Sequence, residues 1–169
     1  MTNSLPYIFL DNDFNLNLAL LILVLDEHGV SARGKNAIDF DKLQVFLYLI
    51  KNPSKINLVL LAAGKKETTI EALHTYTIES RSSNVDILFK REKIKILIKS
   101  AASYGFLAVE RLDDGALMYF LSGDGEKFCL ELTGAHFDGV RRLVLALKPL
   151  LSVSTSKLFS ILSGIFKGF

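Results

Sequence analysis

Three cationic side chains at helical spacing are the first candidates for a chemical role in this sequence. Arg91, Lys95 and Lys99 follow one another at intervals of four residues, which aligns them along one side of a helix. Such a stripe can contact the phosphate backbone of double-stranded DNA, and Lys90 and Lys93 stand beside it. It lacks the Asn, the Gln and the second Arg that usually read base edges, so any DNA contact expected here is with the backbone. The alternative is a plain solvent-exposed face of a helix whose other side packs on the core.

The remaining reactive residue types predict no catalytic, metal or cofactor site. His28, His74 and His136 are far apart in the sequence, and none has a second His or Cys at a metal-ligand spacing. Cys129 lies between Phe128 and Leu130 on a predicted helix, where a buried structural thiol is expected. The chain has no Walker-type loop, no GxSxG and no HExxH motif. We therefore expect a protein that is not an enzyme and that binds no small-molecule substrate.

Two adjacent carboxylates, Asp113 and Asp114, precede Gly115 and could be imagined as metal ligands. The expected structure is instead a solvent-exposed hairpin turn, because Asp and Gly tolerate the backbone angles that tight turns need. An acidic turn is repelled by phosphates, which makes this hairpin tip a poor DNA contact.

The stretch from Lys90 to Leu132 predicts the order helix, strand, tight turn, strand, helix, which is the local plan of a winged-helix unit. Gly105 stands where a left-handed residue ends the first helix, and Ser122 can cap the second. The apolar residues of the first helix are Ile94, Leu97, Ile98 and Ala101. The apolar residues that alternate along the strands are Leu107, Val109, Leu117, Tyr119 and Leu121. A winged helix binds DNA, pairs with another protein or does both, so the fold does not choose between these functions.

The N-terminal part of the chain predicts a series of helices. The first runs from Phe14 to about His28, with Asn12 or Asp13 as its cap, and its leucines point all round, which predicts burial on every face. A second helix follows its cap Asp39 and runs to about Lys51. A third runs roughly from Ser54 to Ala63 with Gly64 after it, and a fourth can start at Thr68 or Thr69 and carry Ile70, Leu73 and Tyr76.

The C-terminal part predicts two more helices. After Thr133-Gly134, one runs to Pro149, and after a polar joint at 152–156 the tail forms an apolar stripe with almost no charge. The stripe consists of Leu158, Ile161, Leu162, Ile165 and Phe166. Such a helix must dock on its own core or on a neighbouring chain, so these five residues are a candidate partner interface.

These elements predict a mainly α protein with a small β-hairpin. The polar segment Ser80–Asn84 is the best linker candidate, and it divides one domain into two lobes. Residues 1–79 form the predicted helical lobe, residues 85–151 form the winged-helix lobe packed on it, and residues 152–169 form the C-terminal amphipathic helix.

Composition favours a subunit that needs a partner. Half of the 169 residues are hydrophobic and the mean hydropathy is +0.32, which indicates more apolar surface than one small core can hide. The net charge of +2 permits DNA contact without arguing for it. A single Cys fits a reducing cytoplasm. We expect neither a signal peptide at Met1–Asn12 nor a membrane span, since the longest apolar run, Leu18–Leu25, is far shorter than the roughly 20 residues a span needs.

Three blocks of the chain resemble the middle component of bacterial three-component ABC-ATPase systems, which include the Lamassu-type anti-phage systems. The blocks are FLDNDFNLNLALLILVLDE, IDFDKLQVFLYLIKNPSKIN and SVSTSKLFSILSGIFKG. The resemblance implies a small non-catalytic subunit without a cofactor. It also implies partners, namely an SMC-like ATPase that engages foreign DNA and an effector, often a nuclease, that is then released or activated.

Two functions from different classes follow. The leading hypothesis is an interaction subunit of an anti-phage complex, which meets double-stranded DNA mainly through that complex. The alternative is a free-standing winged-helix regulator that binds duplex DNA through Arg91, Lys95 and Lys99.

Overall fold

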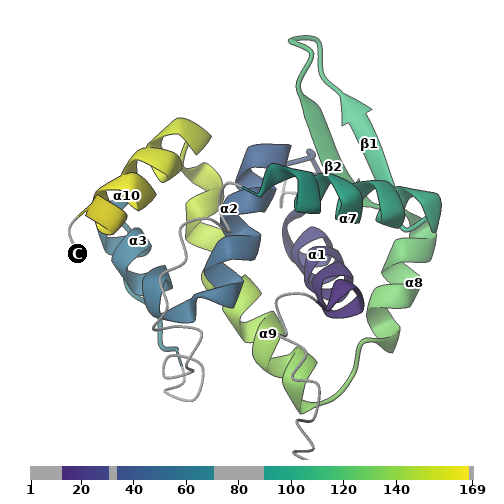
Figure 1. The fold of residues 1–169 in the computed structure, drawn as a ribbon, viewed down its shortest axis with the longest axis horizontal. Coiled ribbons are helices and arrows are strands. Elements are labelled where there is room, and N and C mark those ends of the chain that lie inside the picture. The colour runs from purple at the N-terminus through teal and green to yellow at the C-terminus, as the bar shows by residue number, and fades with distance from the viewer. Residues whose placement is uncertain (1–12, 31–33, 71–89, 168–169) are drawn as a thin grey trace, which may run out of the picture.

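Helix α1 (Phe14–His28) lies at the centre of the fold, where α2, α7, α8, α9 and strand β2 surround it (Figure 1). This computed structural model describes residues 13–30, 34–70 and 90–167. Every residue from Leu18 to Leu25 is buried. The prediction that a helix apolar on all faces is enclosed on all faces is therefore confirmed.

The described chain is mainly helical with one antiparallel hairpin, as the sequence predicts. After α1, the elements are α2 (Phe40–Lys51), the 3-10 turn η2 (Pro53–Lys55), α3 (Ile56–Ala62), α7 (Arg91–Ser103), β1 (Leu107–Arg111), β2 (Leu117–Leu121), α8 (Gly123–Glu131), α9 (Ala135–Ala146), η3 (Lys148–Ser152) and α10 (Thr155–Lys167).

Side-chain caps set the starts of α1 and α2 at the positions that the sequence indicates. The Asp13 carboxylate accepts the N–H groups of Asn15 and Leu16, which opens α1. The Asp39 carboxylate accepts the N–H of Lys42 at 2.7 Å, which opens α2. Each cap satisfies backbone donors that a helix start leaves without partners. The first predicted helix and the second thus begin within one residue of their predicted starts.

The third predicted helix is present in two pieces. Pro53 begins η2 and α3 follows directly, and Gly64 ends the unit with a φ of 73°, which only a residue without a Cβ adopts easily. Thr68 and Thr69 have no helical structure, so the predicted fourth helix does not begin there. Its remainder lies at 71–89, together with the linker candidate at 80–84, outside the described residues.

Helix α7 ends in the paired hydrogen bonds of a Schellman motif. Gly105 has a φ of 76°, its N–H reaches the carbonyl of Ala102, and the N–H of Phe106 reaches the carbonyl of Ala101. The chain then turns directly into β1, which pairs with β2 in the register Leu107 to Leu121. The hairpin projects away from the helical body (Figure 1).

Strand β2 also pairs with the segment that leads into α2. The N–H of Tyr119 donates to the carbonyl of Ile38 at 2.8 Å, and Asp39 and Met118 form an isolated antiparallel bridge. This pairing fixes the base of the hairpin beside the start of α2. Both strands of the hairpin are therefore attached to the body at their base. Strand β1 continues directly from α7, and strand β2 pairs with Ile38 and Asp39.

Candidate functional site on helix α7 and the hairpin

The outer face of α7 is exposed and strongly cationic. Ile94, Leu97, Ile98 and Ala101 are buried and hold the helix on the core, as the predicted stripe requires. The opposite face presents Ile96, whose side chain is 55% exposed. The exposed charged residues around it are Lys90, Arg91, Glu92, Lys93, Lys95 and Lys99. This face thus combines five cations, one anion and a central apolar side chain.

Arg91, the first residue of the predicted DNA stripe, is directed toward α2. Its guanidinium lies 2.5 Å from the carboxylate of Asp41 and its central carbon lies 4.5 Å from the centre of the Phe40 ring. An ion pair and a cation–π contact therefore hold this side chain against the neighbouring helix. The contact joins the start of α7 to the start of α2 and leaves lysines as the outward charges of the face.

Lys95 and Lys99, the other two stripe residues, remain on the outer face. The ammonium of Lys95 lies 2.6 Å from the carboxylate of Glu92, one turn earlier. The hydrogen bond from Lys95, together with the positive charges of Lys95, Lys99 and Arg91, lowers the pKa of the Glu92 carboxyl below its usual value. Within the described part of the chain, Lys99 forms no ion pair, and its charge acts on the Glu92 carboxyl without direct contact. DNA contact through the three residues stays a prediction.

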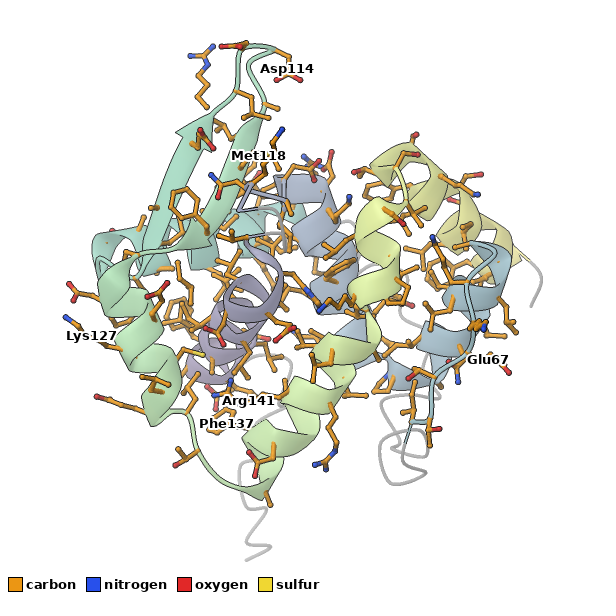
Figure 2. The ribbon with its side chains drawn as sticks, turned by 180° about the vertical axis from the view of Figure 1, so that it is seen from behind. Glu67, Asp114, Met118, Lys127, Phe137 and Arg141 are labelled. Atoms are coloured by element: carbon orange, nitrogen blue, oxygen red, sulfur yellow. The ribbon has the colours of Figure 1, made fainter. Side chains whose placement is uncertain are left out.

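The far half of the hairpin is a second exposed surface. Leu107, Tyr119 and Leu121 point into the core, whereas Val109 and Leu117, on the same face of the sheet, are exposed because the hairpin extends beyond the body. Its tip is acidic, as predicted. Figure 2 shows Asp114 at the tip, distant from the helices.

The turn uses Asp114 for its own backbone. The carboxylate of Asp114 accepts the N–H of Ala116 at 2.9 Å, and Gly115 adopts a φ of 86°. This arrangement supports the predicted hairpin turn. Among residues 13–30, 34–70 and 90–167, no three His, Cys, Asp or Glu side chains gather into a group that could hold a metal ion.

The apolar stripe of the tail docks on its own chain. Leu158 and Leu162 are fully buried, and Ile161, Ile165 and Phe166 pack partly buried against the core, where α10 contacts α2 and α3. The ring of Phe166 meets Tyr48 edge-on with 5.7 Å between the ring centres. A partner interface at these five residues stays a prediction, and the burial of Leu158 and Leu162 confines it to the outer part of the helix.

The sequence did not reveal the polar contacts that join α1, α8 and α9. Arg141 donates to the backbone carbonyls of Cys129 and Leu132 at 2.9 and 3.1 Å, and it lies 3.7 Å from the Asp26 carboxylate. It therefore closes the C-terminal end of α8 and ties that end to α1. Figure 2 labels Arg141 on α9. No local sequence signal marks such a contact, because the partners of Arg141 lie on two other helices, α1 and α8.

The cysteine and one of the histidines, His28, occupy buried structural positions. Cys129 is buried, as predicted, and burial raises the pKa of its thiol. His28 lies at the end of α1, as predicted, but is fully buried, and burial lowers the pKa of its imidazole. His136 is exposed near the start of α9, and His74 lies outside the described residues.

None of the helices in the described ranges is, by itself, long and apolar enough to cross a membrane. The described residues thus define a small helical protein in which an exposed basic helix face and a projecting hairpin are the features available for recognition. A family model, described as ABC-three component (ABC-3C) system Middle Component 4, matches residues 28–160. The chain belongs to this family of middle components. No curated protein and no solved structure gave a match.

Proposed function

We propose that this chain is a non-catalytic interaction subunit of a Lamassu-type anti-phage complex in the cytoplasm. It links an SMC-like ATPase to a nuclease or other effector while the complex senses foreign DNA. The observation that supports this proposal most is family membership, because a middle component of a three-component ABC system functions with other components. The single cysteine and the absence of an enzymatic motif in the sequence agree with it.

The surface of the described residues supports a subunit role. Large apolar side chains stand exposed on several elements, and the most exposed of them, Leu130 on α8 at 78%, lies outside α7 and the hairpin. The others include Leu58 and Leu61 on α3, Ile96 on α7, Val109 and Leu117 on the hairpin, and Leu145 on α9. Scattered single apolar residues are ordinary, but a projecting hairpin with two of them on one face is a typical place for a partner to bind.

We propose further that the chain is a winged helix with an added C-terminal helix. In this arrangement α1, the short segment Ile38–Asp39, α2, α7 and the hairpin follow in winged-helix order, and α3 is an addition between α2 and α7. The pairing of Tyr119 with Ile38 supports this assignment, since it gives the sheet a third short member. The contacts of α1 with both α2 and α7 also support one unit built around α1.

The alternative function, a free-standing DNA-binding regulator, is favoured by one observation. The lysines of α7 stand on the outer face of the helix that precedes the hairpin, where winged-helix proteins read DNA. Against it, Arg91 pairs with Asp41 and the hairpin tip is acidic. Both features weaken phosphate attraction, so the subunit function is preferred.

A three-way pull-down tests the leading proposal. The ATPase, the effector and this chain are co-expressed with a tag on the ATPase, and the same experiment is repeated without this chain. We expect the effector to be recovered only when this chain is present. Equal recovery of the effector in its absence would show that it does not link the two partners.

A further inference from the structure

We propose that the outer face of α7 is a docking surface for an acidic amphipathic segment of a partner protein. This inference rests on the proposed function, because it assigns a specific surface of the subunit to one of its protein contacts. The segment would place an apolar side chain on Ile96 and carboxylates on the surrounding lysines.

The charge of the face supports an acidic occupant. Between Lys90 and Lys99 the chain has four lysines, one arginine that pairs with Asp41 and one glutamate, and all of these side chains are exposed. Glu92 is engaged by Lys95, so the carboxylate of this face is already neutralised within the chain. A partner that brings its own carboxylates would therefore find net positive charge along the helix.

The position of Ile96 supports a protein occupant. Successive residues of a helix are about 100° apart, which puts Ile96 nearly opposite the buried stripe and between the directions of Lys93 and Lys99. An apolar centre with a polar rim is the usual anatomy of a protein interface. A Lys at this position would have served a phosphate backbone better, since a phosphate gains little from an isoleucine side chain.

Two further observations favour protein over nucleic acid. The face's one arginine, whose planar fork suits phosphate, is held by Asp41 and the Phe40 ring on α2. The hairpin that follows α7 in the chain ends in Asp113 and Asp114, which are exposed and would repel a duplex laid along the helix.

The test uses surface variants with matched controls on another helix. Lys95→Glu with Lys99→Glu reverses the charge of the face, and Ile96→Asp removes its apolar centre. Lys127→Glu is the control for the first change, because Lys127 also pairs with a carboxylate three residues earlier, at 3.0 Å from Asp124. Leu130→Asp is the control for the second, because Leu130 is the more exposed apolar residue. Figure 2 labels Lys127 on α8.

The readout is the affinity of each full-length variant for the co-purified partners, measured by biolayer interferometry, with thermal melting as the check of folding. We expect the α7 variants to melt as the wild type does but to bind at least about tenfold more weakly, while the α8 controls bind normally. Wild-type affinity should also fall between about 0.1 M and 1 M salt, since the screening length drops from about 10 Å to about 3 Å.

Three results would overturn the inference. Wild-type affinity in the α7 variants would remove only this assignment and leave the subunit function intact. Nanomolar binding of wild-type protein to a 30-base-pair duplex, lost in the α7 variants while partner binding is kept, would assign the face to DNA. Failure of the wild type to bind either partner would overturn the proposed function and this inference with it.

Discussion

The Nε2 atom of His28 lies 2.7 Å from the carbonyl oxygen of Val144, a residue 116 positions later in the chain. This contact joins the end of α1 to α9 inside the core. The ring also meets Phe46 edge-on, with 5.5 Å between the ring centres, and its Nδ1 is buried without a hydrogen-bond partner. The neutral imidazole that donates from Nε2 fits this site, whereas an imidazolium would leave a charged N–H unpaired in it.

The buried His28 predicts a loss of stability as the pH falls. Burial lowers its pKa in the folded state below the ordinary value of 6.5. Below that pH the unfolded chain takes up a proton at His28 and the folded chain resists it, so the free energy of unfolding decreases by up to about 1.4 kcal/mol per pH unit. Urea unfolding between about pH 7 and pH 5 measures this slope.

A matched pair of variants isolates the contribution of His28. In His28→Gln the amide can still donate to Val144 but does not titrate, so the slope should be shallower than in the wild type. His136→Gln, the same change at an exposed histidine, is the matched control for the substitution itself. If His28→Gln and the wild type had identical slopes, burial of His28 would not be the origin of the pH dependence.

Gly125 predicts a steric effect at the start of α8. A Cβ on Gly125 would lie 2.0 Å from the backbone carbonyl oxygen of Phe106, so Gly125→Ala should destabilise the fold by about 1–3 kcal/mol. Gly123→Ala is the control, because a Cβ there meets no atom within 4 Å, and it should be neutral or stabilising by up to about 1 kcal/mol. Equal melting temperatures for the two variants would contradict the packing of α8 on Phe106.

Substitution of Arg141 should reduce the stability of the fold more than substitution of an ordinary surface arginine. Arg141→Ala removes the donor to the carbonyls of Cys129 and Leu132, which should cost about 1–3 kcal/mol in chemical denaturation. Arg141→Lys keeps the charge near Asp26 but cannot span both carbonyls, so an intermediate loss is expected. A loss in Arg141→Lys as large as in Arg141→Ala would leave no measurable role for the charge.

The packing of the C-terminal helix on its own chain should contribute to the free energy of unfolding. Leu158 is fully buried, so Leu158→Ala should destabilise the isolated protein by about 2–5 kcal/mol, and removal of Lys157–Phe169 should cost more. Ser160→Ala, at an exposed position of the same helix, is the control. Unchanged stability of Leu158→Ala, with weaker assembly, would instead favour the partner interface predicted for this stripe.

Local signals in the sequence were sufficient for most of the described elements. The carboxylates of Asp13 and Asp39 and the hydroxyl of Ser122 cap the helices that the sequence assigns to them, because a cap depends only on residues within one turn. Gly105 and Gly115 adopt the positive φ angles that their positions predict. The predicted alternation along the two strands is also present, with Leu107, Tyr119 and Leu121 on the buried face of the hairpin.

The features that depend on distant residues could not be predicted in this way. Arg91 turns toward Asp41, which is 50 residues earlier, so the stripe inferred from spacing lost its arginine in the folded protein. His28 was expected at a helix end, but its burial required α9 to lie across that end. Ile96 was readable as an apolar residue opposite the buried stripe, yet its significance emerges only once the rest of the face is known to be exposed.

The central claim is that this middle component acts as a subunit, and the mass of the particle it forms tests that claim most directly. The chain is co-expressed with the other components of its system, and the eluted species is weighed by size-exclusion chromatography with light scattering. We predict one particle whose mass accounts for all components, this chain included. A monodisperse, partner-free protein that binds duplex DNA with nanomolar affinity would contradict the account and favour the regulator.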